Sequence, residues 1–325
     1  MAKQFKDYIL ITFKGLAMGA ADVVPGVSGG TIAFIAGIYE ELLLTIKNFP
    51  VAVKDLFKNR FNLKLFWKSA NINFLLALIL GIGISIVSLA KLTIYMLAHY
   101  PVPMWSFFFG LVMASVWFVL REIKSWKPTY FIFFVVGIAA GYLITIVSPA
   151  ETPEDLWFIF LSGAIAICAM ILPGISGSFI LLILGKYQYI LTALTEVNIP
   201  VILTFASGAL IGIISFSHFL SWLLKNYHAI TISFLGGIML GSLNKIWPWK
   251  TVVESIVKPD GEIVPIVENN ILPAAYTEIT GAPSHILYAV IMFIVGLSII
   301  FVIDNVARKM KAKRSESGIL TGSGE

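Results

Sequence analysis

Six apolar runs of about twenty residues restrict this chain more than any other feature of its sequence. A helix of about 20 apolar residues crosses the hydrocarbon core of a bilayer. Only 13% of the 325 residues are charged, whereas soluble domains carry about 25%. We therefore expect an all-α polytopic membrane protein, and the composition excludes a soluble enzyme, a disordered protein and a nucleic-acid binder. The predicted spans are 72–97, 102–121, 129–148, 199–224, 229–247 and 284–304.

Two further apolar segments are too long for one span, and proline and glycine interrupt each near its middle. Segment 8–47 contains VPGVSGG at 24–30, and segment 156–197 contains LPGISGS at 172–178. Forty residues can form two full spans or the two shorter arms of a re-entrant hairpin. We prefer the hairpin, because irregular backbone within the membrane suits a binding site better than a surface loop does.

The two interrupted segments belong to a longer internal repeat. An offset of 148 residues aligns the two motifs and pairs Tyr39 with Tyr187, while an offset of 127 pairs Gly110 with Gly237. The offsets differ by 21 residues, which corresponds to an insertion in the first half at about 50–71. Each predicted unit is a broken hairpin followed by three transmembrane helices. The units are repeat 1 at 8–148 and repeat 2 at 156–305, within a single membrane domain, 1–325.

The positions of the charges predict the orientation of the units. Basic residues gather between 47 and 68, at 121–127 and at 308–314, which is typical of cytoplasmic segments. The segment 248–283 is net acidic and is predicted to be an extracytoplasmic loop. Each unit crosses the membrane an odd number of times, three with hairpins or five with full spans. The second unit is therefore expected to be inverted, with the N-terminus and the tail at 306–325 in the cytoplasm.

The motif residues suit an anion site. Glycines permit tight turns and close approach of a ligand, and the following half-helix would present free N–H groups and a partial positive charge. Serine and threonine can cap that helix and donate hydroxyl groups. The alternative is that the glycines only permit tight helix packing. The candidate substrate-binding residues are Ser28, Gly29, Gly30, Thr31, Ser176, Gly177 and Ser178.

Charged residues near the motifs are candidates for gating, coupling or recruitment. Asp22 precedes the first proline by three residues, and Glu40 and Glu41 end the second arm of the first hairpin. We assign these three carboxylates to gating or coupling, and we expect Lys186 and Arg121 to attract an anionic head group. The alternatives are a structural ion pair for Asp22, interfacial positions for the two glutamates and Lys186, and a cytoplasmic anchor for Arg121.

No motif predicts catalysis or a cofactor. The sequence has no GxxxxGK[ST] nucleotide loop, and its four histidines and one cysteine show no metal-ligand spacing. We therefore expect no catalytic residues, no metal and no cofactor.

The sequence DVVPGVSGGT at 22–31, together with LPGISGS at 172–178, resembles the bacterial polyprenyl-phosphate transporter family over about 8–305. The resemblance implies a flippase that returns undecaprenyl phosphate from the outer to the inner leaflet of the bacterial plasma membrane for reuse in cell-wall synthesis. It implies that this lipid and the bilayer are the partners, with protons or cations as candidate coupling ions. The second motif departs from the first at Ser178, which aligns with Gly30, so the roles of the two tips stay open.

Three other functions fit some of these observations. A proton- or ion-coupled transporter of a small anion or solute could use the same half-helix tips, and would need an aqueous vestibule. A lipid transporter would instead need a cleft that opens sideways to lipid. A membrane enzyme that acts on a lipid phosphate lacks a catalytic constellation in the sequence. A scaffold is disfavoured by the charged residues inside the spans.

Overall fold

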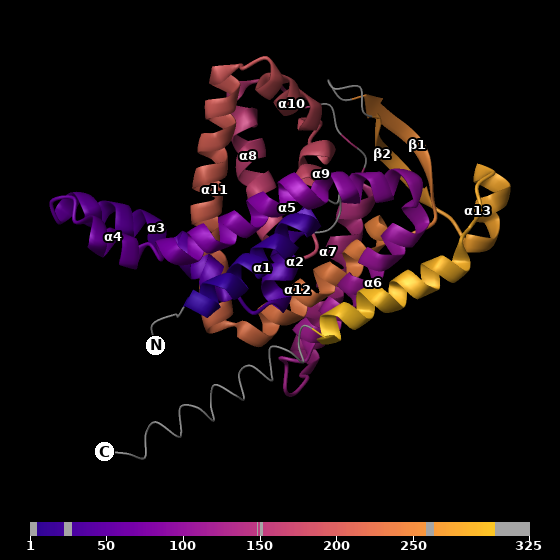
Figure 1. Ribbon diagram of the computed structural model, residues 1–325, viewed down its shortest axis with the longest axis horizontal. Coiled ribbons are helices and arrows are strands. Elements are labelled where there is room, and N and C mark those ends of the chain that lie inside the picture. The colour runs from indigo at the N-terminus through magenta and orange to yellow at the C-terminus, as the bar shows by residue number, and fades with distance from the viewer. Residues whose placement is uncertain (1–4, 23–27, 148, 150–151, 258–262, 303–325) are drawn as a thin grey trace.

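Helices make up most of the described chain (Figure 1). The computed structural model describes residues 5–22, 28–147, 149, 152–257 and 263–302. The first half contains α1 (Phe5–Asp22), α2 (Gly29–Ile35), α3 (Tyr39–Lys58), α4 (Leu63–Ser69), α5 (Ile72–His99), α6 (Pro101–Leu120) and α7 (Pro128–Ile146). The second half contains α8 (Leu156–Ile171), α9 (Gly177–Ile183), α10 (Tyr187–Thr195), α11 (Ile199–Asn226), α12 (His228–Ser242), the 3₁₀-helix η1 (Leu243–Ile246), α13 (Pro273–Thr280) and a last apolar helix, Ile286–Val302.

The lengths and composition of these helices confirm an all-α polytopic membrane protein. Among the described residues, four helices are long and apolar enough to cross a bilayer, or up to seven if each bent pair is one span. The four are α6, α7, α11 and the continuous helix His228–Ile246. Pro25, Gly26 and the tail at 306–325 lie outside the described residues.

Each broken segment contains a second bend that the sequence analysis did not predict. The chain bends by 116° between α2 and α3 and by 108° between α9 and α10. Gly37 (φ +67°) and Gly185 (φ +63°) occupy these bends, because glycine adopts left-handed backbone without steric cost. The second arm of each hairpin is therefore two helices. Our placement of Glu40 and Glu41 at the end of an arm was wrong, since both lie in the first turn of α3.

The element bounds follow the two sequence offsets. α2 and α9 begin 148 residues apart, and α5 and α11, each of 28 residues, begin 127 apart. α1 packs along α5, as α8 packs along α11. The third span of each predicted unit packs against the other unit, because α7 lies along α12 and the last helix lies along α6. Gly237 closely faces the backbone of Phe134 in the first of these contacts, and its repeat partner Gly110 faces the backbone of Phe293 in the second.

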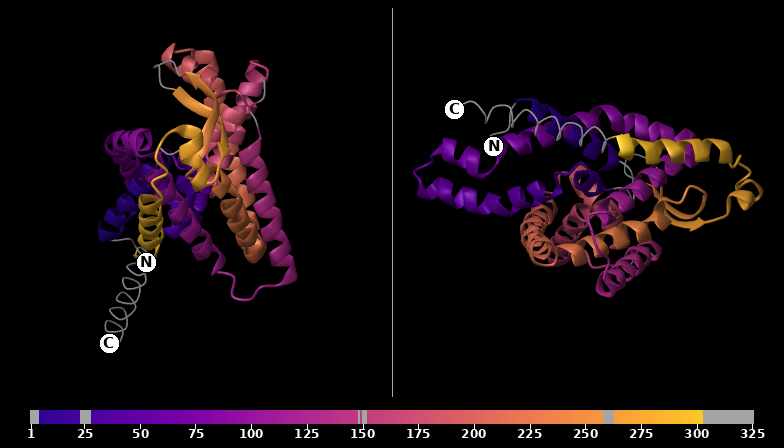
Figure 2. Two further views of the ribbon diagram at one scale, coloured as in Figure 1. Left: turned by 90° about the vertical axis from the view of Figure 1, so that its right-hand side faces the viewer. Right: turned by 90° about the horizontal axis from the view of Figure 1, so that it is seen from below.

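Two charged segments expected to be loops are folded. The basic segment 47–68 continues α3 and forms α4, and this helical pair projects to the left in Figure 1 and in the right-hand view of Figure 2. The acidic segment 248–283 contains an antiparallel hairpin of β1 (Lys250–Val257) and β2 (Ile263–Asn270), followed by α13. The hairpin packs next to η1 (Figure 1). In its register, Lys250 pairs with Asn270.

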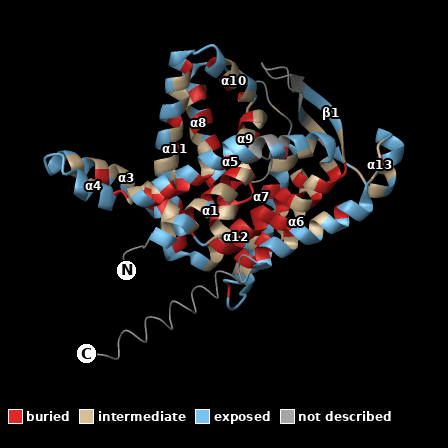
Figure 3. Cartoon of the chain, viewed as in Figure 1, coloured by how far each residue is buried: buried red, intermediate tan, exposed pale blue. Residues whose placement is uncertain are grey.

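Burial is concentrated on the helices at the centre of the molecule. Figure 3 shows the buried residues gathered along α6 and α12, whereas α7 and α11 are largely exposed. In a membrane protein, an exposed apolar surface of this kind faces lipid. α2 packs against α1, α6 and α8, and its residues Gly29, Gly30 and Thr31 are buried. The described part of the first motif, from Ser28 onward, therefore lies inside the protein.

Candidate functional site

The start of α2 is fixed by two local hydrogen bonds that the motif supplies. Ser28 caps the helix, and its hydroxyl accepts a hydrogen bond from the Gly30 N–H at 3.0 Å. The Gly29 N–H donates to Oδ1 of Asp22 at 2.6 Å. A carboxylate at a helix N-terminus satisfies free N–H groups and interacts favourably with the helix dipole. The carboxylate of Asp22 thus occupies the place at the α2 tip where an anion would bind.

Ser28 also joins the two broken segments. Its hydroxyl lies 3.1 Å from the carbonyl oxygen of Met170 and 3.3 Å from that of Leu172, so it can donate to either. The backbones approach closely here, since a Cβ atom added to Gly30 would lie 2.5 Å from the carbonyl oxygen of Ile171. Only glycine fits at position 30 without moving the end of α8. Of the predicted substrate-binding residues, Ser28 therefore contacts the second motif at Leu172, and Gly30 packs against the end of α8 just before that motif.

Two further hydroxyl groups complete this contact. The Gly174 N–H donates to Oγ1 of Thr31 at 2.9 Å, and the Tyr39 hydroxyl donates to the carbonyl oxygen of Ile171 at 3.1 Å. We call Ser28, Thr31 and Tyr39, with 170–174, the junction. Thr31 was predicted from the motif, but Tyr39 was used only to align the repeats. Tyr39 and its repeat partner Tyr187 each lie two residues after the glycine of a bend, and this repeated polar side chain was the sequence signal that we missed.

The junction is closed in this structure. Ser28, Thr31 and Tyr39 are 1%, 0% and 2% exposed, and each hydroxyl bonds to backbone of the other segment. Each such neutral hydrogen bond stabilises a protein by about 0.5–1.5 kcal/mol. A ligand reaches these groups only when the two segments separate.

The second tip differs from the first. Ser176 precedes α9 but makes no side-chain cap, and its hydroxyl shares a hydrogen bond of 2.8 Å with the Ser178 hydroxyl. Gly177 packs closely against the carbonyl oxygen of Ala166 on α8. Position 170 is methionine where the first copy has Asp22. Within the described part of the chain, the α9 tip therefore carries two hydroxyl groups and lacks a counterpart of the Asp22 carboxylate.

The two predicted cations, Lys186 and Arg121, lie next to the ends of helices other than α2. Lys186 is 2% exposed and donates to the carbonyl oxygen of Thr152 at 2.8 Å, next to the bend after α9. Arg121 ends α6 and lies over the ring of Phe118.

The two predicted glutamates lie together at the start of α3. Glu40 is 3.9 Å from Nε2 of His228, which is also 3.8 Å from Glu122. Glu41 accepts a hydrogen bond of 3.0 Å from Asn71. The structure thus separates these two carboxylates from Asp22 and places Glu40 in a histidine–carboxylate cluster.

The region of the chain that holds this junction is also the region that known proteins share. A family model described as undecaprenyl phosphate translocase-like matches residues 18–264. The chain belongs to this translocase-like family. It is 44% identical over 309 residues to the polyprenyl-phosphate transporter of Vibrio cholerae serotype O1, covering 95% of this chain and 100% of the relative.

A second relative has the same name. This translocase-like chain is 33% identical over 265 residues to the polyprenyl-phosphate transporter of Staphylococcus aureus, covering 76% of this chain and 88% of the relative. No solved structure matches the chain. The two relatives and the family model confirm the resemblance that the paired motifs indicated.

A polar cavity of about 410 Å³ in this translocase-like protein was not predicted from the sequence. Its walls come from the end of α7, from η1, from the β-hairpin and from Phe179 of α9. Oε2 of Glu268 lies 2.9 Å from Nζ of Lys245 and 3.3 Å from Nζ of Lys250. Two lysines five residues apart, at the edge of a net acidic segment, were the sequence signal.

Burial changes the titration of this cluster. It lowers the pKa of Lys250 to about 8, although the charge of Glu268 opposes this effect and that of Lys245 adds to it. Burial alone would raise the pKa of Glu268, but the charges of Lys250 and Lys245 outweigh it and hold that pKa below its ordinary value. Glu268 is therefore ionised near pH 7, and the cluster has a net positive charge.

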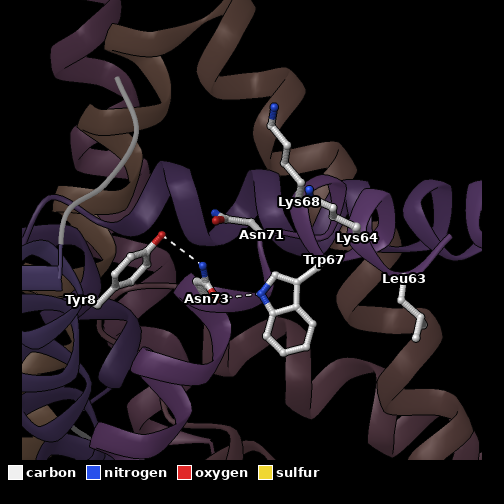
Figure 4. A pocket seen from close by; sticks show the side chains of 7 residues that line it. All are labelled: Tyr8, Leu63, Lys64, Trp67, Lys68, Asn71 and Asn73. Atoms are coloured by element: carbon white, nitrogen blue, oxygen red, sulfur yellow. Dashed lines mark hydrogen bonds between the residues drawn. The ribbon is translucent and has the colours of Figure 1, made fainter.

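A second cavity, of about 530 Å³, is lined by residues of α4, by Asn71 and Asn73 at the start of α5, and by Tyr8 of α1 (Figure 4). Nε1 of Trp67 donates to Oδ1 of Asn73 at 2.7 Å, and Nδ2 of Asn73 is 3.5 Å from the Tyr8 hydroxyl. Lys64 and Lys68 line the same cavity. Tryptophan, tyrosine and lysine in one place are typical of a membrane–water interface, which fits the predicted cytoplasmic position of this segment.

Proposed function

We propose that this protein transports polyprenyl phosphate, specifically undecaprenyl phosphate, from the outer to the inner leaflet of the bacterial plasma membrane. There the carrier lipid would be reused in cell-wall synthesis. Both relatives are named polyprenyl-phosphate transporters, which supports a lipid phosphate as the substrate. The observation that carries the proposal is the junction, where buried hydroxyl groups join two broken helices.

The physical problem is the head group. A phosphate monoester carries a charge of about −1.5 to −2, and transferring an unpaired charge into hydrocarbon costs many kcal/mol. The polyprenyl tail has no such cost, because it stays in lipid. A protein therefore needs to provide polar groups for the head group alone, and the junction provides hydroxyl and backbone N–H donors inside the bundle.

Opening of the junction would free the donors that its hydrogen bonds now occupy. The hydroxyls of Ser28 and Tyr39 now donate to carbonyl oxygens, and the Gly174 N–H donates to Thr31. A phosphate would accept the same hydrogen bonds as charge-assisted ones, which contribute about 1.5–3 kcal/mol each, against about 0.5–1.5 for neutral bonds. Binding can thus offset the loss of the closed contact. Gly29, Gly30, Ser176, Gly177 and Ser178 complete the proposed head-group contacts.

We propose that the two units, 8–148 and 156–305, are inverted with respect to each other. Their offsets pair the α5–α6 turn with the α11–α12 turn. Glu122, beyond the end of α6, lies beside His228 at the start of α12, so these paired turns lie at opposite ends of α6. α2 and α9 have seven residues each, about 10 Å of helix, which is too short to cross a bilayer and favours re-entrant hairpins. Both termini are then cytoplasmic, and 248–283 is extracytoplasmic.

The charged residues have separate proposed roles. Asp22, at the α2 tip, would couple transport to a proton or cation, and its contact with the Gly29 N–H supports this role because the carboxylate would compete there with an anion. Glu40 and Glu41 act at the cytoplasmic gate. Lys186 and Arg121 attract the head group near the two surfaces. These roles require no metal or catalytic step, and we infer a transporter rather than an enzyme.

The test is a reconstituted assay with undecaprenyl phosphate in both leaflets of liposomes and a phosphatase added outside. We expect the protein to make the inner-leaflet lipid accessible to the phosphatase, whereas protein-free liposomes expose only the outer leaflet. Liposomes loaded with inorganic phosphate test the alternative, a small-anion transporter. Phosphate released without added phosphatase would indicate an enzyme. Either of these two results, without lipid translocation, would overturn the proposal.

A further inference from the structure

We propose that the cavity between the β-hairpin and α9 captures the phosphate head group of the lipid substrate, with Lys245 and Lys250 as its ligands. The Glu268 carboxylate would compete with the phosphate for the two lysines, and it holds them together when no phosphate is bound. This inference rests on the proposed lipid-phosphate transport and adds to it a second binding site, separate from the junction. The hairpin lies on the face that we propose to be extracytoplasmic, where the lipid would be collected.

Lys245 has capacity for a further anion. An ammonium group has three donors, and among the described residues Nζ of Lys245 donates only to Glu268, at 2.9 Å. The same ammonium group lies over the ring of Phe179, 4.8 Å from its centroid. Its side chain is 14% exposed, so the charge is screened from bulk water but open to the cavity.

Lys250 is held rigidly beside it. Its ammonium group donates to the carbonyl oxygen of Lys245 at 2.6 Å, and it lies over the ring of Trp105 at 4.0 Å. The third contact is Oε2 of Glu268 at 3.3 Å, longer than the Lys245 contact with the same oxygen. Both lysines thus share one carboxylate oxygen, the geometry in which a phosphate oxygen would bridge two cations.

The charges favour an exchange of anions. Two lysines and one glutamate leave a net charge of +1 on the cluster, and a phosphate monoester carries about −1.5 to −2. A phosphate has three terminal oxygens to share between the lysines, whereas Glu268 uses one oxygen for both. Neutralising Glu268 would therefore strengthen phosphate binding, which is the opposite of the effect expected if the carboxylate only maintains the fold.

The position of the cavity connects it to the second broken segment. Phe179, in its wall, directly follows Ser178 at the α9 tip. Asn270 donates to both the backbone and the side-chain oxygen of Asn244 at 2.8 Å, which fixes the hairpin to η1. A head group bound by the lysines would therefore be next to the α9 hydroxyls before it reaches the junction.

The experiment measures equilibrium binding of undecaprenyl phosphate, of undecaprenol and of inorganic phosphate to the full-length protein in nanodiscs. The variants are Lys245→Met, Lys250→Met, Glu268→Gln and the pair Lys250→Met with Glu268→Gln. Glu254→Gln is the matched control, because Glu254 is an exposed carboxylate of the same hairpin. Thermal unfolding of each variant reports whether it is folded, and the pair avoids leaving a buried carboxylate without its partner.

We expect each lysine variant to bind undecaprenyl phosphate about tenfold or more weakly, since each loses a charge-assisted contact. Glu268→Gln should bind it several-fold more tightly, the paired variant more weakly than Glu268→Gln, and the control like the wild type. Undecaprenol should bind independently of these substitutions. If inorganic phosphate shows the same pattern, the site recognises phosphate itself; if it does not bind, the lipid tail also contributes to recognition. Either result is compatible with head-group capture.

Weaker binding to a folded Glu268→Gln protein, or unchanged binding to both lysine variants, would overturn the inference. The failure of the proposed function is separate. If the expected binding pattern is found but the wild type moves no lipid in liposomes, the cavity is a phosphate site in a protein that is not a flippase. If the wild type moves lipid and both lysine variants move it equally well, transport stands and this site does not serve it.

Discussion

Oγ1 of Thr31 accepts a hydrogen bond of 2.9 Å from the backbone N–H of Gly174, across 143 residues of sequence. The two residues belong to the two copies of one motif, and both are buried. The two motifs are thus in direct contact. If the head group passes between them, as we propose, this hydrogen bond has to break.

Thr31→Val should destabilise the closed state. The substitution keeps the shape of the side chain but leaves the Gly174 N–H buried without an acceptor, which costs about 1–3 kcal/mol. Thr231→Val is the control, because among the described residues the Thr231 hydroxyl bonds only to Tyr227 of its own helix turn. Thermal unfolding in one detergent should show a clearly lower midpoint for Thr31→Val than for Thr231→Val. Equal midpoints would mean that the junction contact contributes little.

Gly30→Ala should impair transport by forcing the two segments apart. Its Cβ would lie 2.5 Å from the carbonyl oxygen of Ile171, and backbone at that distance has to move. Gly83→Ala is the matched control in α5, since an added Cβ there meets nothing within 4 Å. We expect the phosphatase-accessibility assay to show a large loss of rate for Gly30→Ala only. Wild-type rates from both variants would contradict the close approach.

Asp22→Asn separates the charge of this residue from its hydrogen bond. The amide oxygen of asparagine can still accept from the Gly29 N–H, now at 2.6 Å, so we expect the stability to change by less than about 1.5 kcal/mol. Coupling requires the carboxylate, and the response of transport to an imposed proton gradient should therefore disappear. A variant that keeps the wild-type response would exclude Asp22 as the coupling group.

The affinity for undecaprenyl phosphate should fall as the pH rises through about 8. The pKa of Lys250 is lowered to about 8 by burial, so above that pH Lys250 loses the charge that binds the phosphate. The groups around it are Lys245, Glu268 and the Trp105 ring, with Tyr142 in the cavity wall. The phosphate, with a second pKa of about 6, keeps its charge over this range. Binding curves between pH 7 and 9.5 provide the measurement.

Lys250→Arg is the control for this pH dependence. Arginine stays protonated throughout the range, so the variant should bind with an affinity that no longer falls near pH 8. A flat wild-type profile, or the same fall in Lys250→Arg, would assign the titration to another group.

The fold class could be predicted from the sequence because apolar run length depends only on bilayer thickness. The positions of the two breaks followed from proline and glycine, and the offsets of 148 and 127 residues recur in the helix bounds. The bends at Gly37 and Gly185 could not be predicted, because a single glycine is tolerated inside a helical pattern. The β-hairpin was missed because the segment was interpreted by its charge and not by its alternation.

The contacts of the candidate site could not be predicted from the sequence. The sequence singled out Ser28, Gly30 and Thr31, but their partners at 170–174 depend on how two distant segments pack. The cluster of Lys245 and Glu268 joins residues 23 apart through the register of a hairpin that was not predicted. Local pattern thus identified residue types suited to phosphate, whereas tertiary packing decided which of them are free and which are paired.

The most direct test of the central claim compares Ser28→Ala with Ser115→Ala in the liposome assay for undecaprenyl phosphate. Both serines are buried, but within the part of the chain that the structure describes the Ser115 hydroxyl bonds only to Leu111 in its own helix. If the head group passes through the junction, Ser28→Ala should translocate the lipid about tenfold or more slowly, because a cap and a phosphate donor are lost together. Ser115→Ala should translocate at the wild-type rate. Equal, undiminished rates for the two variants would contradict a pathway through the junction.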